Sequence, residues 1–277
     1  MNRIAIRIAA LFCGLFGIVL SVVGQDASSG NSRIQQSQKL VVWKFDDVVA
    51  GAGDRAVSER WQRMADYLED NKIKGSFGVI GYSLVEDNPA YFKWITDRAG
   101  RGYIEFWNHG FHLRRQNRDG TFEPQFAIDE FLRSYDEQLY SLQTTDRLAK
   151  EKLGLDFPVW GPHWSNANTD TDRALAQMPQ ILMTFGYPPK TEHYKGFVFR
   201  NRMDIEYPVG NPISEEFKKA YNARKDRVEY FYIQGHPAQW DTETKWKNFF
   251  ETVEFLKAEG VRFVTPSELL EILNSRR

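Results

Sequence analysis

The sequence predicts an α/β protein in which a parallel β-sheet is covered by helices. Two observations predict this class. Short apolar runs of strand length alternate with longer amphipathic segments from residue 39 almost to residue 277. Polar residues directly follow several of the apolar runs, as is expected where parallel strands end at a functional edge. The alternation fits either an open doubly wound sheet or a (β/α) barrel.

The predicted strands are the apolar runs, which are rich in β-branched and aromatic residues. The first of them reads KLVVWKF. In chain order the predicted strands cover residues 39–45, 75–80, 103–107, 159–160, 181–185, 196–199, 228–233 and 261–264.

The predicted helices are the segments between these runs in which apolar residues recur with helical spacing. The chain shows no internal repeat and no low-complexity tract. In chain order the predicted helices cover residues 56–71, 89–98, 128–152, 171–177, 214–223, 242–259 and 266–274.

The N-terminal segment has the pattern of a secretory signal. Residues 1–24 carry two arginines, Arg3 and Arg7, near their start, continue with an apolar run and end in Val22-Val23-Gly24. Residues 25–38 are a polar linker, and residues 39–277 have the length of one large domain. We therefore expect an exported protein, periplasmic or extracellular, without a stable membrane span once the signal is removed. A retained N-terminal anchor is the alternative.

Composition excludes several functional classes. The predicted signal contains two basic and no acidic residues, so its removal changes the net charge from −1 to −3. This is not the charge of a nucleic-acid binder, and no protein partner is implied. The single cysteine, Cys13, lies inside the predicted signal, which leaves the mature chain without disulfides, a thiol nucleophile or a cysteine zinc site.

Two adjacent carboxylates, Asp46 and Asp47, follow the first predicted strand. Consecutive strand residues point to opposite faces, so both can reach one site only where the chain turns. Two acids at the edge of a parallel sheet are costly unless a cation or hydrogen-bond donors compensate them. The alternative is an acid pair that caps a helix or a turn.

Four of the five histidines stand at predicted strand ends, among them His109, His112 and His236. His109 and His112 are three residues apart, so on a helical turn both imidazoles reach one ion, and with a carboxylate they form a set suited to zinc. Alternatively, one is a buried hydrogen-bonding residue and the other is exposed. His236 lies in a Gly-His-Pro turn after a strand, where it is either a proton-transfer residue or a turn-fixing one.

These residues together resemble the motifs of the polysaccharide deacetylase family. Lys44-Phe45-Asp46-Asp47 is similar to its first motif, Asn108-His109-Gly110-Phe111-His112 to its histidine motif, and Gly235-His236-Pro237 to its late histidine motif. Val261 to Leu270 is similar to its closing strand and helix. The resemblance covers residues 39–272, and the motifs occur in the same order as in the family. It implies a distorted (β/α) barrel in a single domain.

The resemblance also implies a chemistry. Asp46 would be the catalytic base, His236 the general acid, and Asp47, His109 and His112 the ligands of a divalent metal, for which we expect zinc. The reaction implied is metal-assisted removal of an acetyl group from a carbohydrate, by hydrolysis of an amide or ester.

The chain departs from the family pattern in two places. The family's histidines usually stand four apart, so either His112 still ligates from a tighter turn or the third protein ligand is lost. Many members carry an Arg near the fourth strand, where this chain reads Trp160-Gly161-Pro162-His163-Trp164. His163 then either replaces that Arg or lines the substrate groove. Trp160, Trp164 and Trp240 are candidates for stacking on sugar rings, with a core role as the alternative.

Two other functions remain as alternatives. A metal-independent glycosidase would use paired carboxylates, such as Asp46 with Glu105. A non-catalytic carbohydrate-binding protein on a decayed deacetylase scaffold would bind a glycan and release no acetate.

Overall fold

The computed structural model describes residues 38–112, 129–188 and 190–276. The predicted signal and all of the predicted linker except its last residue lie outside these ranges. The residues in these ranges form one compact unit. Within the described ranges no helix has both the length and the apolar composition needed to cross a membrane.

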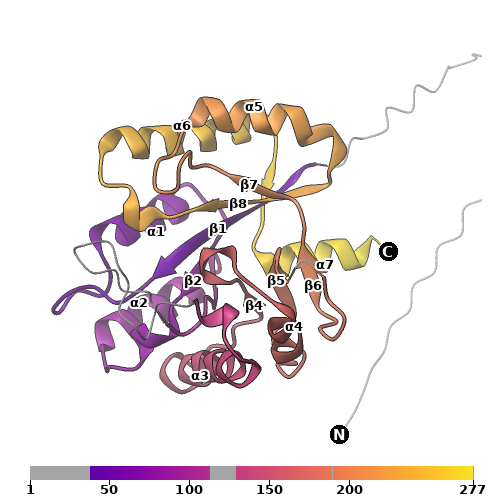
Figure 1. The fold of residues 1–277 in the computed structure, drawn as a ribbon. Helices are drawn as coiled ribbons and strands as arrows, with labels where there is room; N and C mark the ends of the chain where they lie inside the picture. The colour runs from indigo at the N-terminus through magenta and orange to yellow at the C-terminus, as the bar shows by residue number, and fades with distance from the viewer. Residues whose placement is uncertain (1–37, 113–128, 189, 277) are drawn as a thin grey trace, which may run out of the picture. The chain divides into compact units, whose positions relative to one another are not determined.

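The sheet is parallel throughout and curls into a nearly closed barrel (Figure 1). Its strand order is β6-β5-β4-β3-β2-β1-β8-β7, and β9 pairs with the first residues of β1. The two edge strands, β6 and β7, follow each other in the chain, and Asn201 between them accepts a hydrogen bond from the Tyr232 amide of β8. The strands are β1 (Leu40–Val48), β2 (Gly75–Val79), β3 (Ile104–Asn108), β4 (Val159–Trp160), β5 (Met183–Phe185), β6 (Phe197–Phe199), β7 (Arg202–Asp204), β8 (Tyr230–Gly235) and β9 (Arg262–Phe263).

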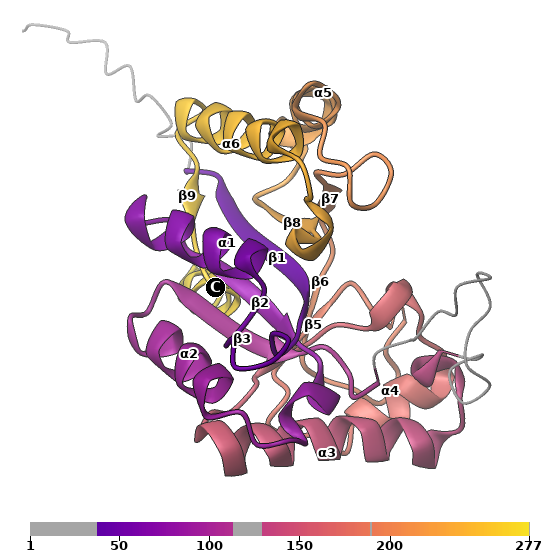
Figure 2. The ribbon, with the colours of Figure 1, turned by 90° about the vertical axis from the view of Figure 1, so that its left-hand side faces the viewer.

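The longer helices lie outside the sheet (Figure 2). α5 packs against α6 and α3 against α4, in two pairs on different sides of the barrel. The helices are α1 (Glu59–Asp70), α2 (Pro89–Gly100), α3 (Tyr135–Leu153), α4 (Thr169–Leu175), α5 (Ser214–Arg224), α6 (Glu243–Ala258) and α7 (Pro266–Ser275). Short 3-10 turns are η1 (Gly81–Leu84), η3 (Glu130–Leu132), η4 (His163–Ser165), η5 (Lys225–Arg227) and η6 (Pro237–Gln239).

The fold class predicted from the sequence is confirmed, with two differences in the elements. β7 was not predicted, because its sequence Arg-Met-Asp is short and largely polar. The helix predicted over 128–152 begins at Tyr135, where Ser134 and Glu137 form a capping box that stops the helix from extending backwards. Residue 128 of that prediction lies outside the described residues.

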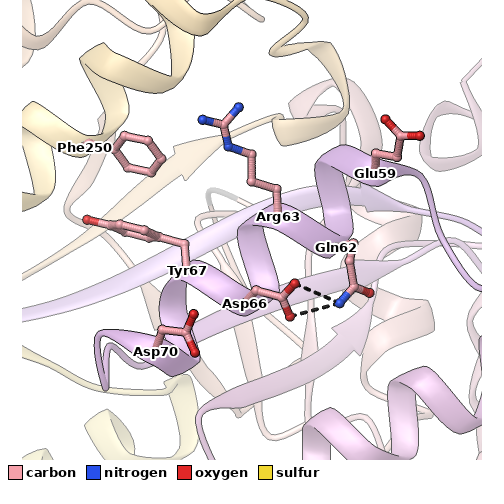
Figure 3. Close-up of a pocket in the computed structure, with 7 residues that line it drawn as sticks. All are labelled: Glu59, Gln62, Arg63, Asp66, Tyr67, Asp70 and Phe250. Carbon is pink, nitrogen blue, oxygen red and sulfur yellow. Dashed lines mark hydrogen bonds between the residues drawn. The ribbon is translucent and has the colours of Figure 1, made fainter.

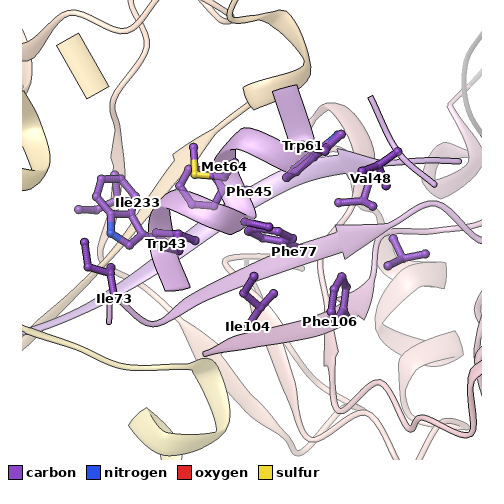
Figure 4. Close-up of a cluster of buried hydrophobic side chains, with 14 of the residues drawn as sticks. Trp43, Phe45, Val48, Trp61, Met64, Ile73, Phe77, Ile104, Phe106 and Ile233 are labelled. Carbon is purple, nitrogen blue, oxygen red and sulfur yellow. The ribbon is translucent and has the colours of Figure 1, made fainter. Parts of the chain in front are cut away.

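Side chains of β1 alternate between two buried clusters, as the strand period of two requires. Val41, Trp43 and Phe45 point outward and pack with helix α1 and the neighbouring strands (Figure 4). Leu40 and Val42 point into the barrel, where Leu269 of α7 packs beside them. α7 therefore covers the amino-terminal end of the barrel. By the same alternation, Lys44 and Asp46 belong to the interior face.

Candidate functional site

A β-bulge in β1 brings the two adjacent aspartates to one site. The register with β2 pairs Phe45 with Phe77 but Val48 with Val79, so β1 carries one extra residue between these pairs. Asp47 adopts a left-handed backbone conformation with φ 74°. The bulge explains how both carboxylates reach the carboxyl end of the barrel, a condition that the sequence analysis had required.

Asp47 lies beside two imidazoles that come from different strands. Its Oδ1 is 3.2 Å from Nε2 of His109 and 3.8 Å from Nδ1 of His163. The ligand atoms of these three residues all lie within 4.8 Å of one another. One carboxylate and two imidazoles are a donor set that suits zinc or a similar divalent ion with an open position.

The hydrogen bonding of His109 fits a cation at this cluster. Its Nδ1 is 2.7 Å from the carbonyl oxygen of Gly161, so Nδ1 carries the proton and donates it. Burial lowers the pKa of His109, which favours the neutral ring. Its Nε2 then presents a lone pair to the Asp47 carboxylate, and two acceptors at this distance are stabilised by a cation that both can bind.

The carboxylate charge of Asp47 is maintained by its neighbours. Partial burial alone would raise the pKa of Asp47, but the surrounding histidines, His163 and His236 among them, outweigh it and hold that pKa well below the usual range. A ligand carboxylate has to be ionised to bind a metal, and Asp47 meets this condition at neutral pH.

His163 is positioned by the short turn η4 and by a buried carboxylate. The two residues after it, Trp164 and Ser165, have φ values of 53° and 60°. Its Nε2 faces Oε1 of Glu130 at 3.5 Å, while its Nδ1 faces Asp47. A carboxylate behind a histidine is the arrangement that orients metal-binding imidazoles. His163 thus stands in the candidate metal cluster, where the sequence analysis had expected an Arg replacement or a groove residue.

His112 lies outside this cluster, although the resemblance to the deacetylase motif implies that it is a metal ligand. The backbone amides of Phe111 and His112 both donate to Glu130, which closes the turn after β3 over that carboxylate. The His112 ring packs against the ring of Phe111, with 4.9 Å between their centroids. We therefore replace His112 by His163 in the candidate ligand set.

Asp46 is buried between a lysine and two histidines. Lys44 Nζ lies 2.5 Å from both of its carboxylate oxygens. Its Oδ2 is 3.7 Å from Nε2 of His236 and 3.9 Å from Nε2 of His109. Asp46 thus lies between the candidate metal cluster and His236.

His236 is held by Glu206, which the sequence analysis did not identify. Glu206 Oε2 is 2.6 Å from Nδ1 of His236, and its Oε1 accepts hydrogen bonds from the His236 amide and the Trp240 indole. Burial alone would lower the pKa of His236, but Glu206 and Asp46 raise it to about 9. His236 is therefore protonated at neutral pH. Glu206 follows β7, the strand that the sequence did not predict.

Two of the three candidate stacking tryptophans are core residues. Trp160 is fully buried and packs against Phe131, and Trp240 is fully buried among the aromatic side chains of α6. Neither ring has a face that a sugar could reach, so substrate stacking on Trp160 or Trp240 is corrected to a packing role. The Trp164 side chain is 64% exposed beside His163.

The structure does not bring together Asp46 and Glu105, the carboxylate pair suggested for a glycosidase. Glu105 accepts hydrogen bonds from the amide and hydroxyl of Ser267 at the start of α7. α7 covers the amino-terminal end of the barrel, whereas Asp46 lies at the carboxyl-terminal end. Glu105 therefore caps a helix and does not face Asp46.

A hollow of about 470 Å³ on the outside of the barrel has no comparable chemistry (Figure 3). It is lined by residues of α1 and α6. Arg63 lies over the rings of Trp246 and Phe250 and pairs with Glu243, while Gln62 binds Asp66. These groups satisfy one another, so this hollow is a seam between two helices.

Comparisons with known proteins identify the fold. No protein-family model and no curated protein matches the sequence. Solved structures do match. A family 4 acetyl xylan esterase from Clostridium thermocellum, in complex with a cobalt ion, is 18% identical with a TM-score of 0.57, over 84% of this chain and 91% of that one. The fold is that of the CE4 carbohydrate esterases.

Two further solved structures extend the comparison. A peptidoglycan deacetylase from Bacillus subtilis is 16% identical with a TM-score of 0.51, over 87% of this chain and 94% of the deacetylase. A CE4 family pseudoenzyme from Bacillus anthracis is 15% identical with a TM-score of 0.55, over 84% of this chain and 66% of the pseudoenzyme. The CE4 fold thus occurs in deacetylases and in a protein described as a pseudoenzyme, so function has to be argued from the site.

Proposed function

We propose that this protein is a metal-dependent hydrolase that removes acetyl groups from a carbohydrate. The observation that carries the proposal is that three groups meet at one end of a CE4-type barrel: a cluster of one ionised carboxylate and two imidazoles, the buried carboxylate of Asp46, and the protonated imidazole of His236. Asp47, His109 and His163 would hold the metal, with zinc as the proposed ion. The deacetylases and esterases that share this fold support carbohydrate as the substrate class.

The metal would act as a Lewis acid on the acyl carbonyl and would lower the pKa of the attacking water. Asp46 accepts the proton that this water loses, because its carboxylate lies beside the cluster without belonging to it. His236 then donates a proton to the leaving nitrogen or oxygen. Its pKa of about 9 keeps it charged at neutral pH, as a general acid requires.

The proposal is tested by acetate release from a panel of acetylated glycans that includes both N-acetyl and O-acetyl substrates. We expect release with added zinc or cobalt and none with a chelator. Asp46→Asn should abolish release while zinc stays bound, and His236→Ala should slow it by roughly 10²- to 10⁴-fold. The matched control is His193→Ala, which should leave acetate release unchanged. The backbone amide of His193 donates to Asp172, and the alanine variant keeps this contact.

Two results would redirect the assignment. Zinc binding without acetate release from any substrate would favour a carbohydrate-binding pseudoenzyme. The observation that gives this second candidate weight is the pseudoenzyme of the same fold, together with a histidine motif in which His112 stands outside the metal cluster. Activity that persists in chelator would contradict the metal-dependent mechanism.

We also propose that the protein acts outside the cytoplasm. The support is the signal-like pattern of residues 1–24, and insoluble glycans are substrates that an exported enzyme can reach. Expression of the full chain in a secreting host, followed by N-terminal sequencing of the exported product, should give a start at Gln25. Retention of Met1 in the membrane fraction would instead support an uncleaved anchor.

A further inference from the structure

Lys44 is a buried charge inside the barrel, directly beneath the candidate site. Only 3% of its surface is exposed. Its Nζ lies over the rings of Trp107 and Phe185, 5.0 Å and 5.5 Å from their centroids. A buried ammonium group is costly unless it is paired and hydrogen-bonded, so the partners of Lys44 decide why it is there.

The partners of Lys44 are Asp46 and Gln234. Nζ contacts both carboxylate oxygens of Asp46 at 2.5 Å and Oε1 of Gln234 at 3.2 Å. Gln234 is the residue of β8 that pairs with Lys44 in the sheet register. Nζ is therefore fixed between two strands and restrains both oxygens of Asp46 at once.

The two adjacent aspartates are chemically alike but differently held. Asp47 has an oxygen within 3.2 Å of His109 and 3.8 Å of His163, whereas the nearest approach of Asp46 to His109 is 3.9 Å. A free carboxylate at this distance competes for the metal, because a small rotation would bring it into ligand range. The ammonium group of Lys44 contacts both oxygens of Asp46 and so restrains this rotation.

We propose that Lys44 is the positioning residue that divides the two aspartates into a base and a metal ligand. It holds Asp46 back from the metal and aims its carboxylate at the attacking water, which leaves Asp47 as the carboxylate ligand. The proposal rests on the proposed function for the role of Asp46 as a base. Its structural part, that Lys44 keeps Asp46 out of the coordination sphere, is tested without turnover.

The structural part is tested on the full domain loaded with cobalt, whose visible absorption reports the number and type of ligands. In Lys44→Met we expect cobalt to remain bound at one equivalent and the spectrum to change, because the released Asp46 becomes a ligand. The double variant Lys44→Met with Asp46→Ala should return to the spectrum of Asp46→Ala alone. Lys44→Arg, which keeps the charge, should retain the wild-type spectrum.

The functional part is tested by kinetics on any acetylated substrate that the wild type accepts. Lys44→Met should lower kcat by roughly 10²- to 10⁴-fold, the range typical of losing a general base, with KM little changed. Lys44→Arg should restore much of the loss. The control Lys74→Met removes a lysine that pairs with Glu268 of α7, and it should leave kcat unchanged.

The outcomes separate the two proposals. A wild type that releases no acetate overturns the proposed function, yet the cobalt spectra still decide whether Lys44 holds Asp46 away. An unchanged Lys44→Met spectrum, full kcat in that variant, or failure of the wild type to bind cobalt would each overturn the positioning role. Lys44→Gln, which can still hydrogen-bond to Gln234, replaces Lys44→Met in every arm if the latter does not fold.

Discussion

Glu206 sets the protonation of His236 at the scale of single residues. The carboxylate is buried and binds both the ring and the backbone amide of His236. Glu206→Gln keeps the shape but removes the charge, so we expect the pKa of His236 to fall from about 9 toward its ordinary value of 6.5. The alkaline limb of the pH–rate profile should move down with it, and NMR titration of the His236 ring measures the shift directly.

The same shift makes His236 contribute to stability in a defined pH window. Its pKa in the folded protein is above the unfolded value, so its stabilisation is fully present below about pH 6.5 and is lost as the pH rises through about 9. The unfolding free energy should therefore fall across this window more steeply in the wild type than in Glu206→Gln. Urea denaturation at a series of pH values measures this dependence. If the unfolding free energy falls equally steeply with pH in both proteins, and the His236 titration is unchanged, Glu206 has a packing role only.

The third prediction at this scale separates His163 from His112. His163→Ala removes one of three ligands, so zinc affinity should fall by more than the ~10- to 100-fold typical of losing an outer partner. His112→Ala removes a ring that packs on Phe111 outside the cluster, and the affinity should change by less than about 10-fold. Competition with a chromophoric chelator measures both. Equal losses would return His112 to the ligand set.

The turn after β3 is the element that presents His109 and shapes the site around Glu130. Gly110 has φ 78°, and a Cβ there would overlap the Glu130 carboxylate. Gly102 has φ 75° and open space around it, so it is a matched control for backbone strain alone. Gly102→Ala should cost about 1 kcal/mol of unfolding free energy, and Gly110→Ala about 1–3 kcal/mol more.

The overlap with Glu130 in Gly110→Ala should also weaken metal binding. Displacing Glu130 releases the amides of Phe111 and His112 and removes the group that faces His163. We therefore expect weaker zinc binding in Gly110→Ala and unchanged binding in Gly102→Ala. Urea denaturation and chelator competition on the two variants give the two measurements. If both glycines cost the same, the overlap with Glu130 is relieved by local movement.

At the element scale, the sequence predicts what local patterns encode and misses what long-range pairing decides. Strands such as β1 and β8 are predictable because their apolar runs are long enough to be buried. β7 is a strand only because β8 lies beside it, so its three residues carry no signal of their own, and Glu206 after it was missed for the same reason. The contact between Lys44 and Gln234 could not be predicted either, because the two residues are far apart in the sequence.

The candidate metal site shows the same division. His109 and Asp47 could be predicted from motif order, which a short sequence pattern preserves. His163 could not be assigned as a ligand, because the left-handed backbone of Trp164 and Ser165 and the position of Glu130 place it there. Trp160 looked like a groove residue only because the sequence does not tell which side of a two-residue strand faces the core.

At the scale of the whole molecule, the candidate site lies at the end of a barrel whose other end is filled. The interior below Lys44 is apolar and aromatic, and α7 covers the amino-terminal end with Leu269. Polar groups that need water or a metal are therefore placed at the carboxyl-terminal end of the barrel. The apolar interior thus stabilises the fold, and the strand ends carry charged groups whose burial in the interior would be costly.

The last prediction concerns the coupling of metal binding to the stability of the whole barrel. Asp47, His109 and His163 come from β1 and from the segments after β3 and β4, so a metal bound by all three joins parts of the sheet that are distant in sequence. A ligand that binds only the folded state adds about 2.7 kcal/mol of unfolding free energy at a concentration of 100 times its Kd. Zinc at that excess should raise the denaturant midpoint of the wild type and leave that of His163→Ala nearly unchanged. Calcium, which prefers oxygen ligands, is the control ion and should have no such effect. Equal stabilisation of both proteins by zinc would show that the ion binds elsewhere and would remove His163 from the metal site.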